Sequence, residues 1–250
     1  KRTVVGTAMS TFKHQYIAKW FLSDEKIEEI LKGSKAVAAQ ASGDVQNNNE
    51  IKIPAKHDNS IERYDIQGKK FDAYLLEIKD PTRVKVGYTK KLGKEGQRTS
   101  QIAKENGAVA AVNGGGFTDK SPDGKLWAGT GGYPTGTVIS DGKLIYTDAA
   151  EDQKIMTMAL TKDGLLKIGN QSINDMKKDG VKEAISFGPA LIVNGKSQVS
   201  GDGGQGTNPR TAIGQKKDGT ILLLVIDGRQ ALKPGATLRE VEEIMLQYGA

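Results

Sequence analysis

Tight-turn dipeptides recur between short apolar runs, and they constrain the fold more than any other feature of this sequence. Four segments carry Asp-Gly or Asn-Gly between apolar stretches: VISDGKLIYT, LTKDGLLKIG, LIVNGKSQVS and AIGQKKDGTILLLVI. Asp, Asn and Gly tolerate the positive φ angles that two-residue hairpin turns require. A fifth hairpin is predicted around Gly68, within YDIQGKKFDAYLLEI. Because each hairpin places two neighbouring strands antiparallel, the sequence predicts a mostly antiparallel sheet.

Three helices are predicted from capping residues and apolar spacing. The last, in TLREVEEIMLQYGA, begins with a capping box formed by Thr237 and Glu240 and ends at Gly249. The others are predicted in SDEKIEEILKGS and in TSQIAKENGA, the second with its N-cap near Thr99 or Ser100. Two apolar segments, VKVGYT and AVAAV, are predicted to be further strands, the second buried and running into a glycine turn. The predicted fold class is α+β, with a mostly antiparallel β-sheet built from hairpins and a few packed helices.

A polar, aperiodic stretch, QASGDVQNNNE, separates the first predicted helix from the hairpins. Such a composition is typical of a linker. We therefore predict an N-terminal helix and linker over residues 1–60 and one domain over residues 61–250. Because the chain begins with Lys1 instead of Met, we expect that an N-terminal signal or membrane anchor has been removed.

The composition excludes several kinds of site. The 250 residues include no cysteine, which excludes disulfides, iron–sulfur clusters, thiolate zinc sites and cysteine nucleophiles. The two histidines, His14 and His57, lack metal-ligand spacing. The net charge of +6 comes from lysines scattered through turns, without an arginine–aromatic stripe, so we expect no nucleic-acid partner.

A G-x-G-x-x-G pattern is formed by Gly201, Gly203 and Gly206. A dinucleotide-binding turn of this type needs a strand before it and a helix that starts at its last glycine. Here Gly206 is followed by TNPR and then by a predicted strand. The context therefore argues against a nucleotide site.

Four polar clusters flank apolar strands, where side chains meet solvent beside a rigid scaffold. Taken singly, each is explained as a turn or a solvated strand end, whereas four together favour a functional site. The clusters are AVNGGGFTD, with Asn113, Gly114, Gly115, Phe117 and Asp119; SFGPAL, with Gly188; TNPRTAIG, with Asn208 and Arg210; and VIDGRQ, with Asp227 and Arg229.

Five motifs, in this order, resemble the phosphodiester glycosidase family: VNGGGFTD, ISFGPALIVNGK, NPRTAIG, LLVIDGRQ and a G-x-T-L-x-E-x-x-x-I-M helix. The resemblance covers about residues 61–250. The family includes an enzyme that removes N-acetylglucosamine from a phosphodiester-linked mannose, and bacterial relatives labelled exopolysaccharide biosynthesis proteins. Family members usually continue past this helix into a strand ending in an Asp-Gly-Gly-Gly-Ser-like motif. This chain stops at Ala250, before that point, so the resemblance implies that it lacks the C-terminal strand and with it part of the family's site.

The resemblance implies hydrolysis of a sugar-1-phosphodiester, of the N-acetylglucosamine-1-phosphodiester type, at the anomeric carbon. The phosphodiester stays anionic at neutral pH, and a planar guanidinium matches two of its oxygens. Arg210 is the first candidate for this contact and Arg229 the second. Carboxylates are needed to stabilise oxocarbenium-like charge or to activate water, and Asp227 and Asp119 are the candidates.

Further residues are predicted to bind the substrate. Asn113 and the backbone amides of Gly114 and Gly115 are expected to contact sugar hydroxyls or phosphate oxygens, because glycine permits close backbone approach. Phe117 is a candidate for stacking on a sugar face, although a core position explains it equally well. Asn208 is a further candidate for substrate binding.

No cofactor is expected to be required. Calcium is the one ion with candidate oxygen ligands, in DKSPDGK and SGDGGQG, although neither has EF-hand spacing. The expected partner is a phosphorylated glycan or sugar-1-phosphodiester in cell-surface or exopolysaccharide material, and the expected location is extracellular or at the cell surface. Two alternatives stay open: a non-catalytic cell-wall module that binds phosphate-bearing glycan, and a hydrolase of glycans without phosphate.

Overall fold

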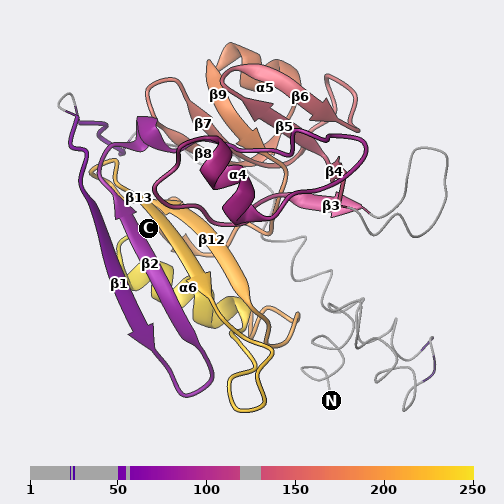
Figure 1. Ribbon diagram of the computed structural model, residues 1–250. Coiled ribbons are helices and arrows are strands. Elements are labelled where there is room, and N and C mark those ends of the chain that lie inside the picture. The colour runs from indigo at the N-terminus through magenta and orange to yellow at the C-terminus, as the bar shows by residue number, and fades with distance from the viewer. Residues whose placement is uncertain (1–22, 24, 26–49, 55–56, 119–130) are drawn as a thin grey trace. The chain divides into compact units, whose positions relative to one another are not determined.

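The computed structural model describes residues 23, 25, 50–54, 57–118 and 131–250 (Figure 1). Most of the predicted first helix and linker, and Asp119 with the rest of DKSPDGK, lie outside these residues. The described chain forms mostly antiparallel sheets with short helices, which confirms the predicted α+β class. It clusters into two compact units, Glu50–Lys79 with Pro189–Ala250 (unit 1) and Asp80–Gly188 (unit 2).

Unit 1 contains a four-stranded antiparallel sheet. The predicted hairpins around Gly68 and Asp218-Gly219 form its two halves, and the strands β2 and β13 join them. A separate two-stranded hairpin forms around the predicted Asn194-Gly195 turn. The strands in sheet order are β1 (Ile61–Gln67), β2 (Asp72–Ile78), β13 (Ile221–Ile226) and β12 (Arg210–Gln215), and the small hairpin is β10 (Ile192–Val193) with β11 (Lys196–Ser197).

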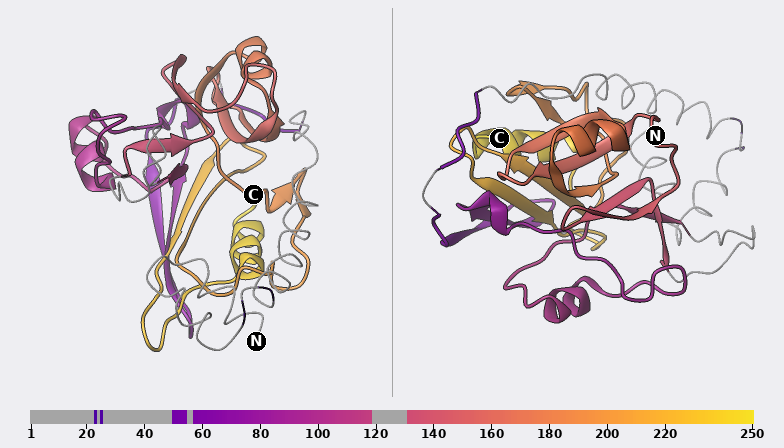
Figure 2. Two further views of the ribbon diagram at one scale, coloured as in Figure 1. Left: turned by 90° about the vertical axis from the view of Figure 1, so that its right-hand side faces the viewer. Right: turned by 90° about the horizontal axis from the view of Figure 1, so that it is seen from above.

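The C-terminal helix α6 (Leu238–Gln247) packs on one face of the unit 1 sheet (Figure 2). Alternate residues of β13 point to this face, so Leu222, Leu224 and Ile226 form a core with Val241 and Met245 of the helix. The capping box of Thr237 and Glu240 is present, and Gly249 follows the helix with φ of +92°. The predicted start and stop of this helix are thereby confirmed.

Unit 2 is built on a five-stranded antiparallel sheet and a short two-stranded one. The hairpins predicted at Asp141-Gly142 and Asp163-Gly164 are both confirmed, and Asp141 has a φ of +48°. The large sheet has the order β6 (Lys143–Thr147), β5 (Thr137–Ser140), β9 (Val181–Ile185), β7 (Ile155–Thr161) and β8 (Leu166–Gln171), and the small one pairs β3 (Gly116–Thr118) with β4 (Tyr133–Thr135).

Helices α4 (Thr99–Glu105) and α5 (Ile173–Lys178), with the single turn η1 (Pro81–Arg83), complete unit 2. Helix α4 was predicted, but its N-cap is Arg98, one residue earlier than expected. Helix α5 was not predicted. It starts with a capping box of Ser172 and Asp175, and it buries Ile173 and Met176 against the large sheet. No helix within the described ranges is long and apolar enough to cross a membrane.

Two predicted strands of unit 2 are wrong. The segment VKVGYT, residues 84–89, forms no strand because side chains take up its backbone groups: the Val86 N–H donates to the Glu183 carboxylate (2.9 Å), and the Val86 carbonyl accepts from Ser140 Oγ (2.8 Å). The segment AVAAV, residues 108–112, is neither a strand nor buried, and Val109 is 80% exposed. Its alanines offer little apolar area to bury, and the strand begins only at Gly116.

Candidate functional site

The motifs NPR and DGR come together at one end of the unit 1 sheet. The antiparallel register pairs Arg210, the first residue of β12, with Ile226, the last residue of β13. Asp227 therefore follows on the strand next to Arg210, and its N–H donates to the Asp72 carbonyl (2.9 Å). Two of the predicted catalytic residues thus lie at the same end of one sheet, on adjacent strands.

The guanidinium of Arg210 is half-buried, and within the described part of the chain it contacts only neutral acceptors. Its Nε donates to the Ala236 carbonyl (3.2 Å), Nη1 to Gln205 Oε1 (3.0 Å), and Nη2 to the Gly206 carbonyl (3.0 Å). Because a guanidinium has five N–H donors, two remain after these bonds. Among the described residues, no carboxylate forms an ion pair with Arg210.

Burial lowers the pKa of Arg210 to about 10. This value is still well above neutrality, so the side chain is a cation at pH 7. A cation that is partly desolvated and has no carboxylate partner is unfavourable by itself, and it is stabilised by any anion that reaches it. The two remaining donors, one on each Nη atom, make a two-oxygen anion the matching ligand.

The G-x-G-x-x-G segment is a loop whose last two residues, Gln205 and Gly206, contact this guanidinium. Gly201, Gly203 and Gly206 all have positive φ angles, of +58°, +81° and +67°. The carbonyl of Gly206 accepts from Arg210, and Gly203 lies so close to helix α6 that an added Cβ would be 2.6 Å from Leu238 Cβ. No helix starts at Gly206, which confirms that this segment is not a dinucleotide turn.

Asp227 is exposed, and two donors hold its carboxylate in one orientation. Oδ1 accepts from the Gly228 N–H (2.8 Å), and Oδ2 accepts from Gln230 Nε2 (2.9 Å). Both donors belong to the turn that immediately follows β13. The carboxylate is therefore accessible to a ligand while its position is fixed by its own loop.

Arg229 and Asn208 both hydrogen-bond to the segment Pro234–Ala236, which precedes helix α6. Arg229 is exposed and has a φ of +61°, and its N–H donates to the Pro234 carbonyl (3.1 Å). Asn208 is buried and bridges Ala236 through both backbone groups, at 3.1 and 2.9 Å. Its side-chain Nδ2 also donates to the Gln205 carbonyl (3.1 Å). Asn208 thus contributes to holding the loop beside Arg210.

We expect Gly235→Ala to destabilise this arrangement strongly. Gly235 has a φ of +113°, and an added Cβ would be 2.3 Å from the carbonyl carbon and oxygen of Asn208. Strain and overpacking together should lower the free energy of unfolding by about 3 kcal/mol. Urea unfolding measures this loss. Gly195→Ala is the matched control, because Gly195 has a φ of +68° but no neighbour within 4 Å, and it should cost about 1 kcal/mol. Equal losses in the two variants would contradict the packing argument.

The other predicted site residues belong to unit 2. Gly114 packs on Ile185, where an added Cβ would be 2.8 Å from the side chain, and Gly115 has a φ of +70°. In the structure Gly114 makes this close approach to the protein's own strand β9, and the expected contact of the two glycines with a ligand stays a prediction. Phe117 is 60% exposed, so the alternative of a core aromatic is wrong. Asn113 is exposed just before the glycine turn.

Sequence reasoning missed a second polar cluster on helix α6. Glu242 is fully buried and forms an ion pair with Arg239 (2.6 Å). A signal was present, because Glu242 follows Leu238 by four residues and precedes Met245 by three, which places it on the buried stripe. A carboxylate at such a position requires partners in the core.

No group of three or more His, Cys, Asp or Glu side chains that could hold a metal ion occurs in the described part of the chain. In SGDGGQG, Asp202 accepts a hydrogen bond from the Gly204 N–H (2.7 Å) and so forms part of its own turn. The second candidate segment, DKSPDGK, lies outside the described residues. The calcium expectation therefore stays a prediction.

Comparison with known proteins gives matches at three levels. A family model described as phosphodiester glycosidase matches residues 106–250. The SPbeta prophage-derived uncharacterized protein YomE of Bacillus subtilis (strain 168) is 26% identical over an alignment of 182 residues, which covers 68% of this chain and 25% of that protein. The chain thus spans about a quarter of the length of this curated relative.

One solved structure shows a similar fold, and a second match is weaker. The zebrafish N-acetylglucosamine-1-phosphodiester alpha-N-acetylglucosaminidase catalytic domain, auto-inhibited by its pro-peptide, matches with a TM-score of 0.60 and 20% identity, over 83% of this chain and 73% of that one. A hypothetical protein from Synechocystis matches with a TM-score of 0.45 and 15% identity, over 76% of this chain and 54% of that one.

Proposed function

The chain belongs to the phosphodiester glycosidase family, and from this membership we propose that it hydrolyses a sugar-1-phosphodiester of the N-acetylglucosamine-1-phosphodiester type. The natural substrate is a phosphorylated glycan of the cell surface or of an exopolysaccharide, and the protein acts outside the cell. We further propose that the reaction needs no cofactor.

The observation that carries this proposal is the state of Arg210. Its guanidinium is half-buried, retains two N–H donors and has no carboxylate partner among the described residues. A phosphodiester has one negative charge spread over two non-bridging oxygens, which fits a planar two-donor fork. In a partly desolvated environment this attraction is stronger than in bulk water.

Asp227, on the turn after the strand next to Arg210, is the carboxylate that we propose for the chemical step. In the proposed step, water attacks the anomeric carbon, the bond from that carbon to the phosphate oxygen breaks, and the phosphate leaves as a monoester. Asp227 accepts the proton of the attacking water or stabilises the positive charge that develops on the sugar ring. Because a phosphate is a good leaving group, protonation of the departing oxygen is less demanding than in the hydrolysis of ordinary glycosides.

Seven further residues retain proposed roles in the site. Arg229 is a second, exposed cation on the turn that follows Asp227. Asn113, Gly114, Gly115 and Phe117 are proposed contacts for the sugar, and the exposed ring of Phe117 is accessible for stacking. Asp119 stays a candidate carboxylate, and Asn208 contributes by holding the loop.

The test compares two substrates that differ only in the leaving group. N-Acetylglucosamine-1-phosphomethyl ester and methyl N-acetylglucosaminide are incubated with the protein, and the release of the free sugar is followed. The proposal predicts turnover of the phosphodiester and no measurable turnover of the neutral glycoside. Equal turnover of both would make the protein a general glycan hydrolase. Salt-sensitive binding of the phosphodiester without turnover would make it a cell-wall binding module.

A further inference from the structure

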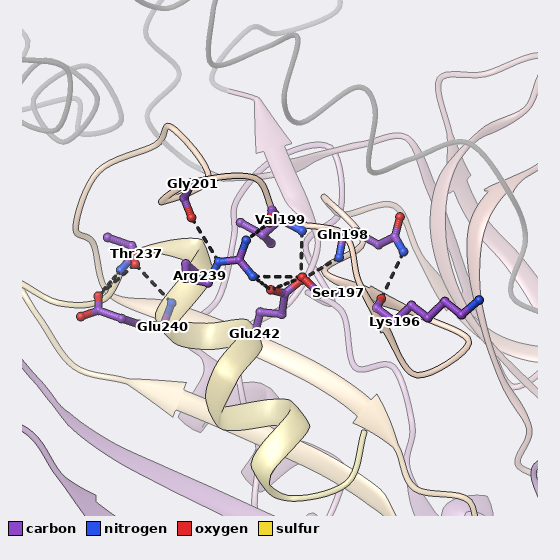
Figure 3. Close-up of polar contacts among 9 residues, drawn as sticks. All are labelled: Lys196, Ser197, Gln198, Val199, Gly201, Thr237, Arg239, Glu240 and Glu242. Carbon is purple, nitrogen blue, oxygen red and sulfur yellow. Dashed lines mark hydrogen bonds and ion pairs between the residues drawn. The ribbon is translucent and has the colours of Figure 1, made fainter.

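A buried ion pair on helix α6 fixes the segment that leads into the glycine-rich loop (Figure 3). Glu242 is fully buried, and its carboxylate accepts from Ser197 Oγ (2.8 Å), from the Gln198 N–H (2.8 Å) and from the Val199 N–H (3.0 Å). A fourth bond, of 2.6 Å, comes from Arg239 Nη1. The carboxylate thus holds consecutive backbone amides of a segment 43 and 44 residues away in the sequence.

The Arg239 guanidinium holds the same segment by donating to two of the segment's carbonyl oxygens and to one hydroxyl. Its Nε donates to the Gly201 carbonyl (3.1 Å), Nη1 donates to Ser197 Oγ (2.9 Å), and Nη2 donates to the Val199 carbonyl. A planar fork can bind several acceptors in one fixed geometry, which a lysine ammonium cannot reproduce. Arg239 and Glu242 together therefore fix both the N–H and the C=O groups of one segment against the helix.

This segment continues directly into the loop that binds Arg210. Two residues after Gly201, Gly203 lies against Leu238 of the same helix. Gln205 and Gly206 then provide two of the three acceptors for the Arg210 guanidinium. The third acceptor, the Ala236 carbonyl, directly precedes the N-cap of α6. The first turns of α6 therefore hold both the loop and the third acceptor.

We infer that Arg239 and Glu242 are positioning residues for the anion site at Arg210, because they fix residues 197–201, and this segment continues into Gln205 and Gly206, which orient the two remaining N–H donors of the guanidinium. This inference rests on the proposed function of Arg210 in binding a phosphodiester. A buried ion pair adds little net stability compared with apolar residues of similar volume, so stability alone does not account for its presence. It does define a geometry, and a displacement of about 1 Å in a binding group costs up to about a hundredfold in rate.

The experiment uses Arg239→Lys and Glu242→Gln in the whole chain. Arg239→Lys keeps the charge and loses the fork, whereas Glu242→Gln keeps the shape and loses the charge. Lys70→Gln is the matched control, because it removes another ion pair to α6, Lys70 with Glu240 (2.9 Å), that does not contact residues 197–206. All measurements are made well below the melting temperature of the least stable variant.

Three readouts separate positioning from loss of stability. We expect the NMR resonance of the Arg210 Nε–H to shift in both variants and to stay in place in Lys70→Gln. The Kd for dimethyl phosphate should rise about tenfold, and KM for the sugar phosphodiester should rise more than kcat falls. If the Glu242→Gln variant does not fold, the same three readouts on the Arg239→Lys variant decide the inference.

The inference would be overturned if, in the Arg239→Lys variant, the Arg210 Nε–H resonance did not shift and the Kd for dimethyl phosphate did not change. The proposed function is judged separately, by turnover in the wild-type protein. If the wild type shows no turnover, the proposed function fails, and the Arg210 resonance still decides whether Arg239 and Glu242 position this guanidinium.

Discussion

Arg210→Ala is expected to lower kcat/KM for N-acetylglucosamine-1-phosphomethyl ester by about 10²–10³-fold. The substitution removes the half-buried cation that has donors left for the phosphate. The chain should remain folded, because the β12–β13 ladder and the core between β13 and α6 do not depend on this side chain. Steady-state kinetics measures the loss, and circular dichroism checks the fold.

Three controls test whether the loss comes from the guanidinium. Arg63→Ala removes an exposed guanidinium that is already paired with Asp65 (2.7 Å), and it should leave turnover unchanged. Arg210→Lys retains a charge without the planar fork and should recover only part of the activity. Added guanidinium ions should partly restore turnover in Arg210→Ala. Undiminished turnover in Arg210→Ala would remove this residue from the mechanism.

Asp227→Asn is expected to lower kcat by about 10²–10⁴-fold while changing KM little. The asparagine side chain keeps the shape of the carboxylate and can still accept from the Gly228 N–H, so the turn after β13 should persist. It cannot take a proton from water or balance positive charge on the sugar. Asp227 should therefore affect the chemical step, whereas Arg210 should affect phosphodiester binding as well.

The matched control for this variant is Asp65→Asn, an exposed carboxylate on β1 that pairs with Arg63. Its turnover should equal that of the wild type. If Asp227→Asn instead raised KM and left kcat unchanged, Asp227 would be a binding residue, and the catalytic carboxylate would have to be sought elsewhere, with Asp119 as the first alternative.

Much of the fold could be predicted because its signals are local. Asp141 and Asn194 adopt the positive φ angles expected of hairpin turns, and Thr237 forms its capping box with a residue three positions away. Helix α5 carried the same kind of signal in Ser172 and Asp175 and could have been found in this way. The helix is short, and its apolar residues alone gave no clear period.

The errors arose where distant residues decide the structure. The backbone of Val86 bonds to Glu183 and Ser140, which no local pattern reveals, so an apolar run that favoured a strand does not form one. In the site, the sequence identified Arg210 and Asp227 but not Gln205 or the Ala236 carbonyl, which bind the guanidinium. These contacts exist because the register of β12 and β13 brings Arg210 beside two loops.

The proposed mechanism is tested most directly by identifying which bond the protein breaks. The protein is incubated with N-acetylglucosamine-1-phosphomethyl ester in water enriched in oxygen-18, and both products are analysed by mass spectrometry. Cleavage between the anomeric carbon and oxygen, as proposed, places the label in the released sugar and leaves methyl phosphate unlabelled. Label in methyl phosphate would show attack at phosphorus, and the proposed glycosidase mechanism would then be wrong.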